Sequence, residues 1–185
     1  MKEISVSNPW HSVKIGNFAP QIVNTIIEIP KGSKAKYELD KESGLIKLDR
    51  VLFSAVHYPA NYGFIPRTLG DDNDPLDVLV MCSIDVDPLC MIEAKIIGLM
   101  EMIDENEKDD KIIAVANNDI SVSYIDDMSM LPPHTTIQLQ RFFEDYKKLE
   151  HKNVIVDRFL GKEEAYKVIE EGIALYNKTF GVQPE

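Results

Sequence analysis

Short runs of apolar and β-branched residues follow one another along the first two thirds of the chain, and turn residues separate them. This is the pattern of β-strands. The clearest run covers residues 22–29 and ends at the turn sequence Pro-Lys-Gly-Ser of residues 30–33. Residues 40–44, Asp-Lys-Glu-Ser-Gly, have the composition of a hairpin loop. The pattern predicts strands over residues 22–29, 35–39, 45–51, 78–82, 91–102 and 111–116.

The spacing of apolar residues changes after Leu131-Pro132-Pro133. Apolar side chains then recur at roughly every third or fourth position, which is the period of an amphipathic helix. This spacing predicts helices over residues 134–150 and 163–180, and Gly181 is a typical helix-ending residue. The apolar positions that carry the pattern are Ile137, Phe142, Tyr146, Leu149, Ala165, Val168, Ile169, Ile173 and Tyr176.

The order of these elements predicts the fold class. Many short strands followed by two helices favour an α+β, mainly β protein, in which a small closed barrel carries the helices on its outside. Residues 1–20 contain two prolines and read as an irregular N-terminal arm, with Trp10 expected to anchor it. We expect one domain over residues 1–185, with the arm at 1–20, the barrel and site loops at 21–130 and the helical part at 131–185.

The composition of the chain argues against nucleic-acid and membrane partners. The 185 residues are 44% hydrophobic and 28% charged, with a net charge of −11 and no basic patch, which disfavours a nucleic-acid partner. Cys82 and Cys90 form no CxxC pair and predict reduced thiols in the cytoplasm. No secretory leader is recognisable, and no apolar run reaches the ~18 residues of a membrane span. We therefore expect a cytoplasmic protein without a membrane partner.

The chemistry of the chain is concentrated in residues 71–77, Asp-Asp-Asn-Asp-Pro-Leu-Asp, where four carboxylates occur within seven residues. Carboxylates this close repel one another unless a cation neutralises them. The segment alone leaves two readings open, a site for a hard cation such as Mg²⁺ and an exposed acidic turn. An EF-hand is excluded, because Leu76 stands at a ligand position and Asp77 at the required glycine.

A second acidic segment, residues 104–111, lies between two apolar runs in the same way. By itself it reads as a solvated turn, but together with residues 71–77 it becomes a candidate second wall of a site for several metal ions. Cationic and phenolic side chains elsewhere could hold an anion rich in oxygen atoms. These are Lys36, Arg50, Tyr58, Tyr62, Tyr146 and Lys147. No P-loop, GxSxG or GxGxxG motif is present.

Taken together, these segments resemble the soluble family I inorganic pyrophosphatases, and the match runs from about residue 22 to residue 149. The heptad continues as Asp72-Asn73-Asp74-Pro75-Leu76-Asp77-Val78-Leu79-Val80, which is similar to that family's D-x-D-P-x-D-x-L-V signature. The details are closest to the plant-like, prokaryotic-type branch. The other matching segments are Glu28-Ile29-Pro30, Lys36-Tyr37-Glu38, Asp49-Arg50, Tyr58 to Gly63, Asp104-Glu105 with Asp109 and Lys111, and Phe142 to Lys147.

The resemblance implies a five-stranded OB-like barrel, hydrolysis of inorganic diphosphate to two phosphates, and several Mg²⁺ ions per active site. It implies that Asp74 is the general base of an in-line displacement by a metal-activated water. The implied metal ligands are Asp72, Asp77, Asp104 and Asp109. The implied substrate-binding residues are Lys36, Arg50, Tyr62, Tyr146 and Lys147. The implied supporting residues are Glu28, Glu38, Tyr58, Glu105 and Lys111.

The remaining expectations concern neighbours and rivals. Asp71 and Asp110 match no functional position and read as solvated bystanders. The resemblance implies a homo-oligomer, a hexamer or alternatively a trimer. Two rival functions stay open, an OB-like nucleic-acid-binding module, which the net charge disfavours, and a catalytically silent scaffold. Substitution of Lys36, Asp74 or Asp77 would have indicated the scaffold, and none of the three is substituted.

Overall fold

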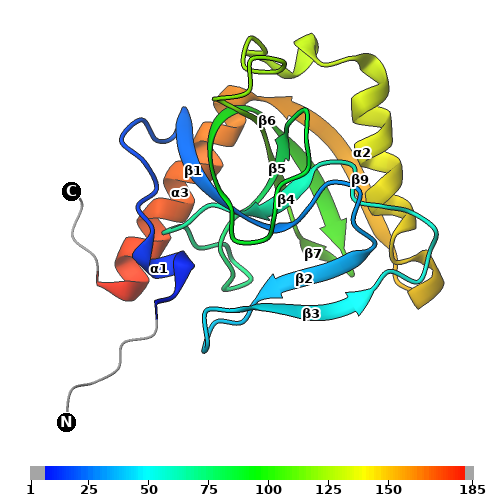
Figure 1. The fold of residues 1–185 in the computed structure, drawn as a ribbon, viewed down its shortest axis with the longest axis horizontal. Helices are drawn as coiled ribbons and strands as arrows, with labels where there is room; N and C mark the ends of the chain where they lie inside the picture. Colours follow the sequence, from blue (N-terminus) through cyan, green and yellow to red (C-terminus); the bar gives the residue numbers. More distant parts are fainter. Residues whose placement is uncertain (1–6, 182–185) are drawn as a thin grey trace.

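The centre of the molecule is a closed ring of five strands, seen end-on in Figure 1. The structure is a computed structural model, and it describes residues 7–181. β1 pairs with β4 along one edge and with β6 along the other, which closes the ring, and only β5 and β8 run parallel within it. The predicted five-stranded barrel is confirmed. In ring order the strands are β1 (Ile22–Ile29), β4 (Asn61–Phe64), β5 (Asp77–Met81), β8 (Lys111–Ala116) and β6 (Met91–Asp104).

The ring strands are almost continuously apolar because both of their faces are covered. In β5, Leu79 belongs to one core cluster, while Val78 and Val80 belong to another. The first cluster includes residues of α2 (Pro133–Asp145), and the second includes residues of α3 (Lys162–Phe180). The two helices lie on opposite sides of the ring (Figure 1). Strands buried on both faces lose the alternating pattern of a half-exposed sheet.

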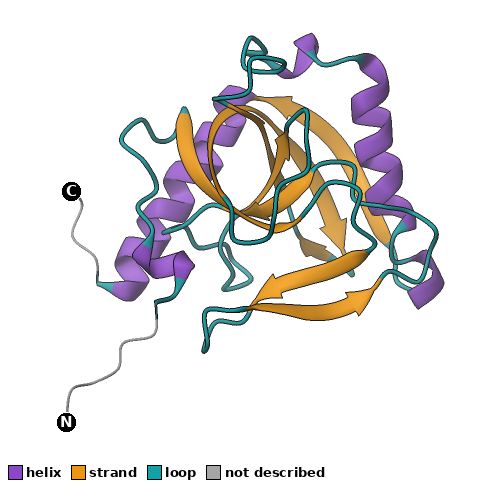
Figure 2. Cartoon of the chain, in the orientation of Figure 1, coloured by secondary structure: helices purple, strands orange, loops and turns teal. Residues whose placement is uncertain are grey.

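Three smaller pieces extend the ring (Figure 2). The hairpin of β2 (Ala35–Leu39) and β3 (Ile46–Val51) stands beside it. β7 (Glu107–Lys108) turns back along β6, and Glu105 and Asn106 in the turn both have positive φ, as tight hairpins require. β9 (Val154–Gly161) pairs with β6 outside the ring. Short 3₁₀ turns, η1 (Met128–Met130) and η2 (Lys148–Glu150), flank α2.

All six predicted strands are present, but three short or late strands were missed. β4 was missed because its four residues alternate too briefly to give a periodic signal, and β7 because it is polar. β9 lies between the two helices, so the last third of the chain is not purely helical as expected. The first predicted helix ends at Asp145, five residues early, and the chain continues into η2. Gly181 ends α3 with φ +67°, as predicted.

The N-terminal arm contains a short helix, α1 (Pro9–Ser12), where irregular chain was expected. The predicted anchor is confirmed, because Trp10 is buried and its Nε1 donates a hydrogen bond to the carbonyl of Thr68 at 2.8 Å. Residues 1–6 of the predicted arm lie outside the described residues. Within residues 7–181, none of the helices combines the length and apolarity that crossing a bilayer demands.

Candidate active site

The acidic segment 71–77 is the end of a loop that folds back on itself before β5. The backbone N–H of Gly70 donates to the carbonyl of Asp74 at 2.7 Å, and the N–H of Leu76 donates to Thr68 Oγ1 at 3.0 Å. Asn73 takes a left-handed conformation with φ +66°, which asparagine tolerates better than most residues. The chain is therefore turned rather than extended between Asp72 and Asp74.

Helix α3 holds this loop from behind. The N–H of Leu69 donates to the carbonyl of Gly172 at 3.0 Å, a contact between loop and helix backbones. A Cβ atom at Gly172 would lie 2.7 Å from Leu76 Cδ1, so only glycine allows this approach without rearrangement. The acidic loop is thus fixed to a rigid element, which favours a defined placement of its carboxylates.

Most of the predicted site residues line a single cavity of about 270 Å³ at the mouth of the barrel. They come from β2, β4 and the loop before it, the acidic loop, β5, the β6–β7 hairpin, β8 and the end of α2. Glu28 and Glu38 line an adjoining cavity of about 470 Å³ that shares Lys36, Tyr62 and three aspartates with the first. The predicted residues in the first cavity are Lys36, Tyr58, Tyr62, Asp72, Asp74, Asp77, Asp104, Glu105, Asp109, Lys111, Tyr146 and Lys147.

Parallel pairing of β5 and β8 brings opposite charges together. The register aligns Val78 with Ile112, so Asp77 and Lys111 begin neighbouring strands. Lys111 Nζ lies 2.5 Å from Asp77 Oδ2 and also contacts Asp109 Oδ1. Burial alone would lower the pKa of Lys111, but the attraction of these two carboxylates outweighs it and raises the pKa. Burial raises the pKa of Asp77, with Asp109 adding to the shift and Lys111 opposing it.

Two further lysines contact predicted site carboxylates. Lys147 Nζ contacts Asp104 Oδ2, whereas Asp104 Oδ1 is buried without a hydrogen-bond partner. Lys41, from the β2–β3 hairpin, contacts Asp74 Oδ1. Partial desolvation raises the pKa of Asp72 above its ordinary value, and Asp74 and Asp109 contribute by repulsion. The cavity thus concentrates negative charge that lysines neutralise only in part.

The tyrosines are held by an aromatic cluster on α2. Tyr58 packs against Phe142 with ring centroids 4.7 Å apart, and Tyr146 stacks on the same ring at 5.4 Å. Burial raises the pKa of Tyr58, Tyr62 and Tyr146 above the ordinary value. All three phenols therefore stay protonated at neutral pH and act as hydrogen-bond donors.

Arg50 and Glu105 lie at the edge of the site. Arg50 is outside the cavity lining, although its charge acts on Tyr58 and Tyr146 and lowers their pKa against the effect of burial. Glu105 sits in the hairpin turn, where its carboxylate pairs with Lys152 at 2.8 Å.

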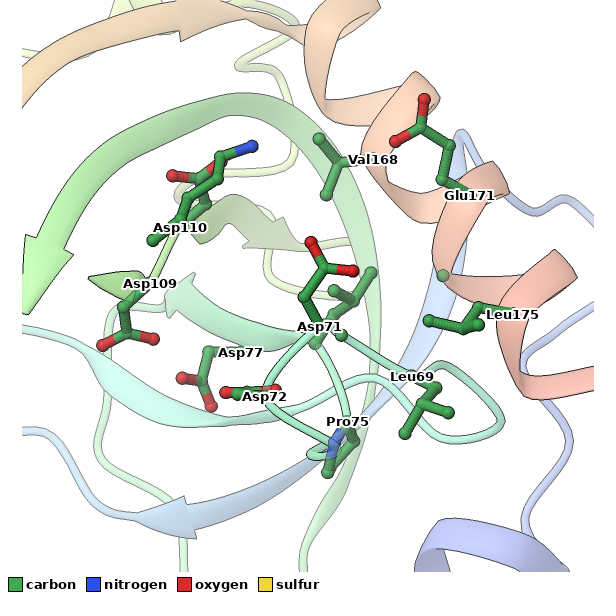
Figure 3. Close-up of a pocket in the computed structure, with 14 residues that line it drawn as sticks. Leu69, Asp71, Asp72, Pro75, Asp77, Asp109, Asp110, Val168, Glu171 and Leu175 are labelled. Atoms are coloured by element: carbon green, nitrogen blue, oxygen red, sulfur yellow. The ribbon is translucent and has the colours of Figure 1, made fainter. Parts of the chain in front are cut away.

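Asp71 and Asp110 line another cavity, of about 130 Å³ and against α3, which shares Asp72, Asp77 and Asp109 with the first (Figure 3). Figure 3 shows the Asp71 carboxylate directed away from Asp72, Asp77 and Asp109, and Asp71 is exposed as expected. The expectation that Asp110 is solvated is wrong, because its side chain is only 9% exposed and pairs with Lys108 at 2.9 Å. Its burial follows from β8, which begins at the next residue.

Sequence reasoning missed several residues that complete the site. Lys41 and Glu150 contact predicted site residues, and Asp49 lies between Lys36 and Arg50. Asp49 could have been suspected from its place beside Arg50. The partners of Lys41 and Glu150 lie 33 and 100 residues away, and no local pattern connects them.

The donor set fits a hard divalent cation. Among residues 7–181, no group of three His, Cys, Asp or Glu side chains forms a preformed metal site. Mg²⁺ does not need one, since it keeps several waters and binds through one or two carboxylates. The buried, unpartnered Asp104 Oδ1 is an acceptor that such a cation would satisfy. Carboxylates beside lysine and protonated tyrosine donors could bind metal ions and phosphate groups in the same cavity.

Comparison with known proteins gives the family. The family model described as "Inorganic pyrophosphatase" matches residues 25–177. "Soluble inorganic pyrophosphatase 2" of Chlamydomonas reinhardtii is 53% identical over 176 residues, covering 95% of this chain and 92% of that protein. "Soluble inorganic pyrophosphatase 1" of Arabidopsis thaliana is 55% identical over 170 residues, covering 92% and 80%. The chain belongs to the inorganic pyrophosphatase family.

The structural comparison agrees. The crystal structure of inorganic pyrophosphatase from Thermus thermophilus superposes with a TM-score of 0.88 at 40% identity, covering 91% of this chain and 98% of that one. The resemblance to the pyrophosphatases and the OB-like fold that it implied are confirmed. Hydrolysis of pyrophosphate is the function that these relatives support, and they give no support to a silent scaffold.

Proposed function

We propose that the protein hydrolyses inorganic diphosphate to two orthophosphates in the 270 Å³ cavity, and that the reaction depends on Mg²⁺. The observation that carries the proposal is the convergence of carboxylates, lysines and tyrosines on that cavity from segments spread between β2 and the end of α2. The metal ions would be held by Asp72, Asp77, Asp104 and Asp109. Carboxylate oxygens are hard ligands, and all four side chains line this one cavity.

The acidic cavity would repel a multiply charged anion without cations. Bound Mg²⁺ would offset that repulsion and lower the pKa of a coordinated water. Asp74, half exposed beside the cavity, would orient the attacking water and accept its proton. Lys36, Arg50 and Lys147 would hold phosphoryl oxygens and neutralise charge on the leaving phosphate.

The remaining predicted residues would support this arrangement. Tyr62 and Tyr146 would donate phenolic hydrogen bonds to phosphoryl oxygens, and Tyr58 would pack and orient them. Lys111 would keep Asp77 and Asp109 in place. Glu28 and Glu38 would act from the adjoining cavity and Glu105 from the hairpin turn.

Phosphate release from inorganic diphosphate tests the proposal. The protein treated with EDTA should release no phosphate, and added Mg²⁺ should restore release. A nucleoside triphosphate serves as the control substrate and should release less phosphate than diphosphate does. Absence of phosphate release at any Mg²⁺ concentration, from protein that is folded by circular dichroism, would refute the proposal.

A homo-oligomer of six or three chains and a cytoplasmic location remain predictions. Large apolar side chains exposed in the described part of the chain, such as Phe53 at 63% and Ile120 at 90%, support association. Light scattering after gel filtration would give the mass, and a monomer would refute the first prediction. Cell fractionation would test the second.

A further inference from the structure

Glu150, in the 3₁₀ turn after α2, contacts the predicted phosphate ligand Arg50 in β3. Arg50 Nε donates a hydrogen bond to Glu150 Oε1 at 3.0 Å. The Glu150 side chain is 11% exposed and that of Arg50 is 24% exposed, so the pair is partly withdrawn from solvent. An ion pair with hydrogen-bond geometry at this depth restricts both side chains more than a surface pair would.

The contact selects one orientation of the guanidinium group. Arg50 Nη1 donates to Asp49 Oδ2 at 2.5 Å, and Asp49 in turn pairs with Lys36 Nζ at 3.2 Å. Carboxylates therefore occupy the Nε and Nη1 sides of the planar group. The Nη2 side remains the part of the fork that an incoming phosphate could engage.

Glu150 also connects Arg50 to the turn that follows Lys147. Its backbone N–H donates to the carbonyl of Lys147 at 2.9 Å, within the turn that ends α2. Lys147 lines the cavity, and Arg50 stands at its edge. One residue thus fixes the spacing between two cations that come from β3 and from the end of α2.

We propose that Glu150 is a positioning residue for diphosphate binding, which holds the Arg50 guanidinium at the cavity edge and fixes its distance from Lys147. This inference rests on the proposed function, because it takes Arg50 as a ligand of the substrate. Glu150 itself is not among the residues that line the cavity. Its effect is geometric, so it requires the hydrogen bond to Nε and not the negative charge.

The test compares Glu150→Ala with Glu150→Gln in Mg²⁺. Alanine removes the acceptor and should raise KM for diphosphate about tenfold with a smaller change in kcat. Glutamine keeps an oxygen acceptor without the charge and should leave KM within about threefold of the wild-type value. Methylenediphosphonate is not hydrolysed, so its affinity can be measured by calorimetry. Its binding should weaken in Glu150→Ala in parallel with the rise in KM.

Glu101→Ala is the matched control, because Glu101 accepts the same type of bond from Arg158 Nε at 2.5 Å away from the cavity. It should leave KM unchanged. If Glu150→Ala fails to fold, Glu150→Asp, whose shorter side chain cannot keep the same bond, replaces it. Unchanged KM in Glu150→Ala, or in Glu150→Asp where it is the replacement, would overturn the proposal. Lowered KM in both Glu150→Ala and Glu150→Gln would also overturn it, because that result would show that only the charge matters.

Arg50→Lys separates this inference from the proposed function. Raised KM in Arg50→Lys with normal KM in Glu150→Ala would refute the role of Glu150 alone. Normal KM in Arg50→Lys would refute the assignment of Arg50 to substrate binding, on which the inference depends. If Glu150 acts through Arg50, adding Glu150→Ala to Arg50→Lys should cause no further loss.

Discussion

The ammonium nitrogen of Lys111 lies 2.5 Å from a carboxylate oxygen of Asp77, in a side chain that is only 3% exposed. Both residues start parallel strands, and Asp109 reaches the same nitrogen from the turn before β8. The lysine therefore stands between two predicted metal ligands and neutralises them in the protein alone. Charge balance in the barrel mouth depends on this contact.

Replacing Lys111 by methionine should destabilise the protein when no metal is present. The substitution keeps much of the apolar stem but leaves Asp77 and Asp109 facing each other without a cation. We expect a loss of about 3 kcal/mol in the free energy of unfolding, measured by urea denaturation in EDTA. The control Lys152→Met removes an exposed pair and should change stability by about 0.5 kcal/mol or less. Equal stability of the two variants would contradict this account.

Asp74→Asn should lower kcat by about 10²- to 10⁴-fold, because asparagine cannot accept the proton of the attacking water. Far-ultraviolet circular dichroism should remain that of the wild type, since Asp74 is half exposed. The neighbouring variant Asp71→Asn removes an exposed carboxylate of the same loop that lies outside the cavity, and it should keep normal turnover. Normal turnover of Asp74→Asn would exclude Asp74 as the base.

Glu28→Gln should stabilise the protein at alkaline pH. Burial raises the pKa of Glu28 from 4.5 to about 8, so between these values the folded state holds a proton that the unfolded state has released. Stability of the wild type must then fall as pH rises through this window, while glutamine stays neutral and can still accept from the N–H of Leu39.

The stability gained by Glu28→Gln should therefore be larger at pH 8 than at pH 5, by roughly 2 kcal/mol or more, given ~1.4 kcal/mol per pKa unit. Urea denaturation in EDTA at both pH values measures it. Glu42→Gln, at an exposed position in the β2–β3 loop, is the control and should show no such dependence on pH. A gain that is independent of pH would argue against a protonated Glu28.

Replacing Mg²⁺ by Ca²⁺ should abolish phosphate release without preventing metal binding. Ca²⁺ is larger and takes about six to eight oxygen ligands in flexible geometry, so it would not hold the water and Asp74 in the same alignment. Calorimetry should show that Ca²⁺ binds and that it competes with Mg²⁺. Undiminished turnover in Ca²⁺ would mean that metal geometry does not control the reaction.

Much of the fold was accessible from local patterns. The runs that gave β1, β2, β5 and β8 are apolar or bounded by turn residues, and these signals lie within a few neighbouring positions. β9 was missed although it begins with the β-branched run Val154-Ile155-Val156, because this run is short and lies between two helical patterns. It pairs with β6, a strand at least 50 residues earlier in the chain. Its strand conformation depends on β6.

The candidate site, too, was predictable from the sequence only in part. The sequence by itself determined which residue types are present, because the acidic heptad and the matching segments carry the family signature in consecutive residues. Only the tertiary structure decided which charges face one another, as with Lys111 between Asp77 and Asp109, or Arg50 on Glu150. The first contact arises from strand register, and the second from the approach of η2 to β3. Electrostatic energies depend on distances in space, and local sequence does not contain those distances.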